Sequence, residues 1–474
     1  MIQAFENFRT NTVIAKVCEF QRSFWYVLCL ALVALISHLA GIELVAIWLI
    51  VLATVFSLVM QEDALPLVPT VLLGYFLVSC GHGAISWSDV GVWQTKPYIV
   101  NLAIVGVLFA VAFIFHLVYY KQYKNFARRT YLTLGLAAFA VAYLINGIFS
   151  KGYTFKNMAY GFSFAALFYL FYLIIFHMVK WKDGESMRYL ARCMFVMGLL
   201  ISIELACLYI RNPELHGVLS NKNDILLGWG NSNSIAFTTL LALPFAFWLA
   251  YKEKYGFVYY LGASVMVLAI FFTYARGSLV VAIPMYAVGS IFLCIKARKK
   301  LGIWICVGVI VITLTILAIW FKDWLHEKFN IYIINGTSDR GRFRLWEIAW
   351  EGFKQSPVFG SGLYFKFGEE PSNYFWAHNT ILQLLATCGI VGLLTYLLHR
   401  VQTIIMFFKK PTMARLFIGI AILGILAAGM VDVVMICQNV ILYYGILLAF
   451  AEKDYLYRVG KIDEEGKPIE ESKK

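Results

Sequence analysis

The stretch TSDRGRFRLWEIAWEGFKQSPVFGSGLYFKFGEEPSNYFWAHNTILQLLATCGIVGLL, residues 337–394, joins a long polar segment to an apolar run. It begins with Arg340, Arg342 and Arg344, and an amphipathic helical pattern follows over about 341–354. A glycine-rich turn then leads to His378 and Asn379, where the apolar run begins. We therefore predict a helix-bearing loop outside the membrane, followed by a membrane-spanning helix.

The composition extends this prediction to the whole chain. Only 14% of the 474 residues are charged and 61% are hydrophobic, so the chain cannot cover a water-exposed surface of normal size. Apolar runs of about 20 residues recur, each long enough to cross a bilayer. We predict an all-α polytopic membrane protein with 12–14 transmembrane helices and one long extracytoplasmic loop that carries an amphipathic helix. The expected spans are 24–42, 43–60, 65–80, 98–118, 130–149, 158–179, 189–210, 232–250, 257–275, 277–295, 301–320, 378–398, 416–432 and 434–450.

The basic residues predict the orientation. With both termini in the cytoplasm, most of the 40 Lys and Arg fall in cytoplasmic segments, as the positive-inside rule requires. This orientation places the lid loop 321–377 and His378 outside. It gives a cytoplasmic N-terminal segment over 1–23, a single transmembrane domain over 24–450, and a charged cytoplasmic tail over 451–474 that we expect to be disordered. The net charge of +13 is explained by loop lysines, so we expect membrane lipid and no nucleic acid as a partner.

Arginines on the outer face are candidates for binding a diphosphate. A guanidinium group matches phosphate oxygens with two parallel donors and keeps its charge. Arg276 lies at the tip of a helical hairpin, and Arg340 and Arg342 begin the loop helix. The alternative for Arg276 is snorkelling or pairing with an acid, and the loop arginines could pair with Glu347 and Glu351.

A histidine and three asparagines complete the candidate site. His378 could take a proton from an attacking hydroxyl, although a lone histidine is more often structural. Asn231, Asn233 and Asn379 could bind sugar hydroxyls or a phosphate, and the alternative for Asn231 and Asn233 is to cap the helix that follows them.

Two acids fall inside apolar runs, and no metal motif is present. Glu204 and Asp432 are intramembrane acids, which are functional by default, but pairing with Arg192 or with polar neighbours explains them equally. The sequence has no HExxH, no CxxC pair and no acidic pair with the spacing of a metal site, so we expect no metal ion and no cofactor.

Taken together, five pieces of the sequence resemble the O-antigen ligase and O-antigen polymerase superfamily of bacterial envelopes. They are GNSNSIAF, ARGSL, SDRGRFRLW, PVFGSGL and AHNTILQLLATCGIVGLL, in this order over about 215–400. The family's hairpin arginine falls on Arg276, its GR-motif arginine on Arg340 or Arg342, and its HN-motif histidine on His378. The family's asparagine pair is often NPN, and here it is NSN.

The resemblance implies a membrane glycosyltransferase of the GT-C type in the bacterial cytoplasmic (inner) membrane. Such enzymes transfer a glycan from a polyprenyl-diphosphate carrier to an acceptor sugar hydroxyl at the outer face. The acceptor is a glycan or a lipid-linked sugar, and the reaction is inverting and metal-independent. The arginines would bind the diphosphate and the histidine would activate the acceptor. Polymerase is favoured over ligase on the span count alone.

Two other functions fit a polytopic chain with outer arginines. A lipid-linked glycan flippase or other transporter would place polar residues along a path through the membrane and would show repeats, and neither is clear in the sequence. A peptidoglycan-type polymerase would share the donor and the topology, but none of its motifs is visible.

Overall fold

The computed structural model describes residues 2–79, 96–126, 130–151, 153–212, 225–320, 322–323, 326, 340–365, 373–374, 377–434, 438–463 and 469. Much of the expected lid loop 321–377 therefore lies outside the described residues, although its predicted helix is among them.

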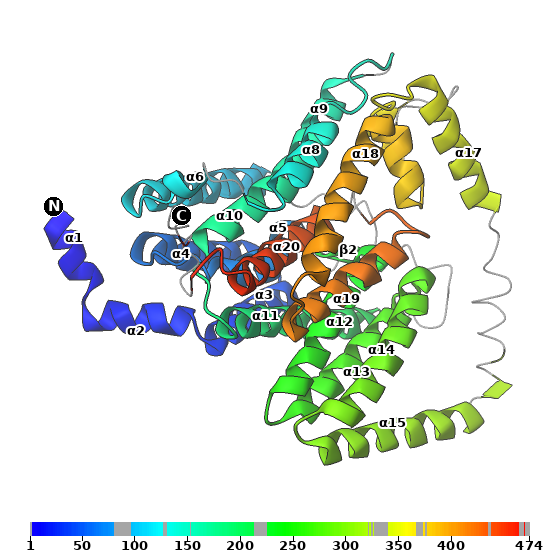
Figure 1. Cartoon of the computed structure of the whole chain (residues 1–474). Coiled ribbons are helices and arrows are strands. Elements are labelled where there is room, and N and C mark those ends of the chain that lie inside the picture. The colour runs from blue at the N-terminus through cyan, green and yellow to red at the C-terminus, as the bar shows by residue number, and fades with distance from the viewer. Residues whose placement is uncertain are drawn as a thin grey trace.

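Helices make up nearly all of the described chain (Figure 1). They are α1 (Ile2–Arg9), α2 (Thr12–Gln21), α3 (Phe24–Ala40), α4 (Glu43–Met60), α5 (Leu67–Ser79), α6 (Lys96–Tyr119), α7 (Tyr123–Phe126), α8 (Thr133–Leu144), α9 (Phe155–Ala165), the π-helix η2 (Ala166–Leu170), α10 (Phe171–Met178), α11 (Glu185–Arg211), α12 (Ser232–Lys252), α13 (Gly256–Phe272), α14 (Arg276–Lys296), α15 (Lys300–Trp320), α17 (Arg340–Gln355), α18 (Thr380–Phe408), α19 (Met413–Ala428) and α20 (Gln438–Arg458). Two short antiparallel hairpins, β1 (Leu226–Leu227) with β2 (Gly230–Asn231) and β3 (Tyr364–Phe365) with β4 (Asn373–Tyr374), complete the secondary structure.

The predicted class, an all-α polytopic membrane protein, is confirmed. Among the described residues, eight helices are long and apolar enough to cross a bilayer, or nine if α2 and α3 form one bent span. The expected number was 12–14. Part of the difference arises because three expected spans form apolar helices of fewer than 18 residues, namely α8, α13 and α19.

The centre of the bundle is α12. Of its most apolar window, 89% is buried, and it packs against α11, α13, α14 and α19. At the other extreme, α15 is only 6% buried and presents apolar side chains on nearly every side. Apolar surface of this kind is expected where a helix faces lipid. Both chain termini lie on one side of the molecule in Figure 1, and α17 lies on the opposite side.

The first part of α18 is separated from the rest by a break at Gly389, where φ is 65° and ψ is −160°. The segment 357–362 fills this break. Ser361 N–H donates to the carbonyl oxygen of Ala386 (2.8 Å), and Ile390 N–H donates to that of Pro357 (2.9 Å). Backbone groups freed by a broken membrane helix must find protein partners, and this segment supplies them. The break leaves a half-helix, Thr380–Cys388, that begins beside His378.

Replacing Gly389 with alanine should lower the stability of the protein by about 2 kcal/mol or more, because the backbone conformation is one that only glycine adopts readily. An added Cβ would also lie 2.4 Å from the carbonyl oxygen of Val358. Thermal unfolding in detergent measures the effect. Gly308→Ala in α15 is the matched control, because no atom lies within 4 Å of its added Cβ. Equal melting temperatures for the two variants would contradict this interpretation of the break.

The C-terminal helix is longer than expected. We expected a disordered tail from residue 451, but α20 continues to Arg458, and Glu452 and Asp454 are buried. Glu452 accepts hydrogen bonds from the backbone N–H groups of Tyr131 (2.6 Å) and Leu132 (3.2 Å). The helix continues past its apolar part because its acids find partners inside the protein.

Candidate functional site

The centre of the site is a histidine–carboxylate pair. Nδ1 of His378 lies 3.0 Å from Oδ1 of Asp432, and the side chain of Asp432 is largely shielded from solvent whereas that of His378 is 33% exposed. A carboxylate at Nδ1 accepts the N–H from that nitrogen, which leaves Nε2 as a proton acceptor. His378 has a φ of 49°, a left-handed conformation uncommon outside glycine that is often found at functional sites. The pair has the geometry of a general base with an orienting acid.

Asn233 holds the other oxygen of the same carboxylate. Its Nδ2 donates to Oδ2 of Asp432 at 2.6 Å, and the backbone N–H of Val433 donates to Oδ1 at 2.8 Å. Asp432 thus has partners on both oxygens before any substrate binds. A carboxylate fixed in this way can orient the imidazole of His378 accurately.

The turn that carries Asp432 is held by the start of α18. Asn379 accepts from the N–H groups of Ile381 and Leu382, both at 3.0 Å, and so caps the helix. Its Nδ2 also donates to the carbonyl oxygen of Met430 (3.0 Å), and the Thr380 N–H donates to that of Gly429 (2.9 Å). Asn379 is therefore a helix cap in this structure. The capping alternative predicted for Asn231 describes that residue, whose side chain caps α12 by accepting from the Ser234 N–H at 3.1 Å.

Arg276 is the first residue of α14 and is half-buried. The residue before it, Ala275, makes no side-chain capping hydrogen bond to the start of α14. The start of α14 lies against the Asp432 turn, because a Cβ added to Gly277 would be 2.5 Å from Cγ2 of Val431. The positive end of the helix dipole and the charge of Arg276 are therefore next to the segment that holds the histidine–carboxylate pair.

The loop helix α17 packs against the half-helix through small residues. Ala349 is fully buried against Ala377 and Ala386, and Ala377 precedes His378. At 100° per residue, Arg342 lies on the same face as Ala349, about 10 Å toward the helix start. Arg340 lies on the opposite face by the same geometry, and its side chain is outside the described part of the structure. Arg342 is half-buried, in keeping with a face directed at the protein.

The predicted helix over about 341–354 is confirmed as α17, Arg340–Gln355. Its aromatic side chains pair along the surface, with ring centroids 5.3 Å apart for Phe343 and Trp346 and 5.2 Å apart for Trp350 and Phe353. Phe343 and Trp350 remain about half exposed. An amphipathic helix with exposed aromatic residues is typical of one lying at the membrane–water interface.

The intramembrane acid Glu204 holds the hairpin that precedes α12. Its Oε2 accepts from Nε1 of Trp229 at 2.7 Å, and both side chains are buried. Trp229 is in the turn between β1 and β2, and this hairpin leads directly into Asn231. Pairing with Arg192 was one alternative for both acids, but Arg192 contacts Glu253 at 3.1 Å instead.

The structure thus brings together most of the predicted residues and adds one. His378 and Asn233 meet on Asp432, Arg276 begins the adjacent helix, and α17, which carries Arg342, packs on the half-helix that follows His378. Asp432 was recognised in the sequence only as an intramembrane acid. Its position just after an apolar run was a signal, but the sequence could not show that a histidine 54 residues earlier is its partner. No group of three or more metal-ligating side chains occurs within the described ranges.

Comparison with known families gives one match. Residues 261–397 match the family described as O-antigen ligase. The matched range contains Arg276, Arg342 and His378 and ends before Asp432. No curated protein matches the chain.

Proposed function

We propose that the chain is a cell-envelope enzyme of the O-antigen ligase family, which residues 261–397 match, and that it transfers a glycan from a polyprenyl-diphosphate carrier to an acceptor sugar hydroxyl. The family acts on lipid-linked glycans, which is consistent with a lipid-borne donor and a glycan or lipid-linked acceptor. The reaction takes place at the outer face of the bacterial cytoplasmic membrane. The observation that carries the proposal is the His378–Asp432 pair at 3.0 Å.

The pair acts as the general base. Nε2 of His378 accepts the proton of the acceptor hydroxyl as the hydroxyl oxygen forms a bond to the anomeric carbon of the donor sugar. The bond between that carbon and the diphosphate oxygen breaks, and the diphosphate leaves with both electrons. Asp432 accepts the hydrogen bond from Nδ1 and stabilises the imidazolium that forms. With no protein nucleophile in this step, the anomeric configuration inverts.

Arginines stabilise the leaving group. Negative charge grows on the diphosphate as the glycosidic bond breaks, and fixed cations in a water-poor site stabilise that charge. Arg276 and the positive end of the α14 dipole supply one side of the diphosphate site. Arg342 supplies the other side of the diphosphate site, because it shares the α17 face that packs beside His378. Arg340 lies on the opposite face. These cations take the role that a metal ion plays in other transferases.

Asn233, Asn231 and Asn379 are positioning residues in this mechanism. Asn233 fixes the carboxylate that orients His378, and the other two fix the starts of α12 and α18. The preference for a polymerase rests only on the predicted count of 12–14 spans, and the described residues form eight or nine long apolar helices and three shorter ones. The choice between these two reactions depends on the acceptor.

A reconstituted assay tests the proposal. The purified full chain in proteoliposomes is supplied with a polyprenyl-diphosphate-linked glycan, with and without a lipid A-core acceptor, and with and without EDTA. We expect release of polyprenyl diphosphate and formation of a new glycosidic bond in both EDTA arms. Product only with the lipid A-core acceptor identifies a ligase, and product from the donor alone identifies a polymerase. Translocation of the donor without bond formation would instead favour a flippase, and loss of transfer in EDTA would contradict the arginine-only mechanism.

A further inference from the structure

An apolar groove of about 500 Å³ lies between α14 and α19, with α12 as its floor. Every residue that lines it is apolar. On α14 the lining residues Val281, Pro284, Val288 and Gly289 recur at helical spacing along one face. This face begins about 8 Å along the helix from Arg276 and continues toward the opposite end of the span.

The groove is open on the side that faces lipid. Val288 on one wall is 66% exposed, and Leu423 on the other wall is 65% exposed. Two glycines let the helices approach closely enough to close its floor. A Cβ at Gly289 would lie 2.8 Å from the Phe247 ring of α12, and one at Gly424 would lie 2.7 Å from Met285. The groove is therefore a cleft entered from the bilayer, with its floor closed by packed side chains.

Both walls of the groove end at the candidate site. The outer end of α14 is Arg276, and α19 ends at Ala428, immediately before the turn that carries Asp432. Gly277 and Val431 hold the two ends together. A ligand with a charged head and a long apolar chain could therefore place its head at Arg276 while its chain lies in the groove.

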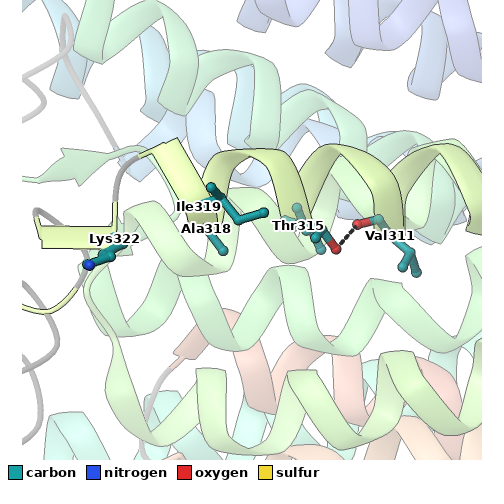
Figure 2. A pocket seen from close by; sticks show the side chains of 6 residues that line it. Val311, Thr315, Ala318, Ile319 and Lys322 are labelled. Carbon is teal, nitrogen blue, oxygen red and sulfur yellow. Dashed lines mark hydrogen bonds between the residues drawn. The ribbon is translucent and has the colours of Figure 1, made fainter.

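A second cavity, along α15, differs from the groove between α14 and α19. The cavity in Figure 2, about 540 Å³, is lined by Lys322 and by α15 residues such as Val311 and Ile319. It lies along the face of a single helix, and none of the site residues described above lines it. An apolar surface alone does not suggest a substrate there, whereas the helices that form the walls of the groove, α14 and α19, lead to Arg276 and to the turn that carries Asp432.

We propose that the groove between α14 and α19 binds the polyprenyl chain of the donor, with its diphosphate at Arg276. This inference rests on the proposed function and adds where the lipid part of the substrate binds. The groove volume accommodates several isoprene units, and the remainder of the chain extends into the bilayer. Burial of several isoprene units contributes to donor affinity, since each buried methylene is favourable.

Filling the groove with a bulky side chain tests the proposal. Val288→Trp places an indole in the groove, and Val280→Trp is the matched control. Val280 is also a valine of α14, is 69% exposed, and does not line the groove. Each variant is assayed in proteoliposomes with two donors that carry the same glycan, one on a full-length polyprenyl diphosphate and one on a diphosphate with two isoprene units.

We expect Val288→Trp to raise KM for the long-chain donor about tenfold or more, relative to Val280→Trp, and to leave the short-chain donor unchanged. If Val288→Trp and Val280→Trp behave alike with both donors, the chain binds elsewhere or exchanges freely with bulk lipid, and the proposal fails. Equal loss with both donors would also contradict it. Leu423→Trp, on the opposite wall, replaces Val288→Trp if that variant is not monodisperse. Failure of the proposed function itself would be distinct, because the wild-type protein would then transfer neither donor.

Discussion

Replacing His378 with alanine is expected to lower kcat for glycan transfer by about 10²–10⁴-fold, because the acceptor hydroxyl loses its general base. Asp432→Asn is expected to lower kcat by a factor in the same range. An amide in place of the carboxylate no longer stabilises the imidazolium and no longer fixes the proton on Nδ1. KM for the donor should change little in both variants, because neither side chain is assigned to the diphosphate. Steady-state kinetics in proteoliposomes separates kcat from KM.

His177→Ala is a suitable control for these variants. His177 is in α10, where its ring packs beside Phe126 at a centroid distance of 5.1 Å, and α10 contributes nothing to the site described above. The double variant of His378 and Asp432 should be no slower than the worse single variant, since the two side chains act as one unit. If the two losses in kcat multiply in the double variant, or if Asp432→Asn keeps full activity, the pair does not act as base and orienting acid.

Replacing Arg276 with alanine is expected to lower kcat/KM for the donor by about 10²–10³-fold, the effect usual for removing one group that stabilises developing charge. Arg276→Lys should recover only part of this activity, because an ammonium group lacks the two-donor match to phosphate oxygens. Binding of a short isoprenyl diphosphate, measured by calorimetry, should weaken in parallel. Unchanged binding of this diphosphate in Arg276→Ala would remove Arg276 from the site.

The loop helix provides an internal comparison for the second arginine. Arg342→Ala should weaken diphosphate binding, whereas Arg344→Ala should leave it unchanged, because Arg344 is exposed on another face of α17. Both variants remove the same charge from the same helix, so a general electrostatic effect would reduce binding equally. Equal loss in the two would assign the effect to net charge and not to a specific contact.

Several features of the site could be predicted from the sequence because each rests on a local pattern. The arginine at the hairpin tip, the amphipathic helix of the long loop and the histidine before an apolar run are all visible within about 20 residues of chain. The choice between Arg340 and Arg342 was not visible. It depends on which face of α17 packs on the protein, and that face is marked by Ala349 and not by the aromatic residues.

Two other features depend on distant segments and could not be predicted locally. Asp432 contacts His378, which precedes α18, and Asn233, which lies in the first turn of α12. The break in α18 at Gly389 looks in the sequence like one glycine in an apolar run, which a membrane helix tolerates. Only the segment 357–362, folded back onto that position, makes the break stable.

The break at Gly389 also means that the position of His378 need not follow a change in the thickness of the bilayer. The half-helix Thr380–Cys388 is held by backbone hydrogen bonds near both ends, to Gly429 at one and to Ser361 at the other. Residues 390–408 carry the lipid-facing length of α18, so a thinner or thicker membrane acts first on their tilt. Because the half-helix is anchored to Gly429 and Ser361, the position of the histidine depends on these contacts more than on the tilt of residues 390–408.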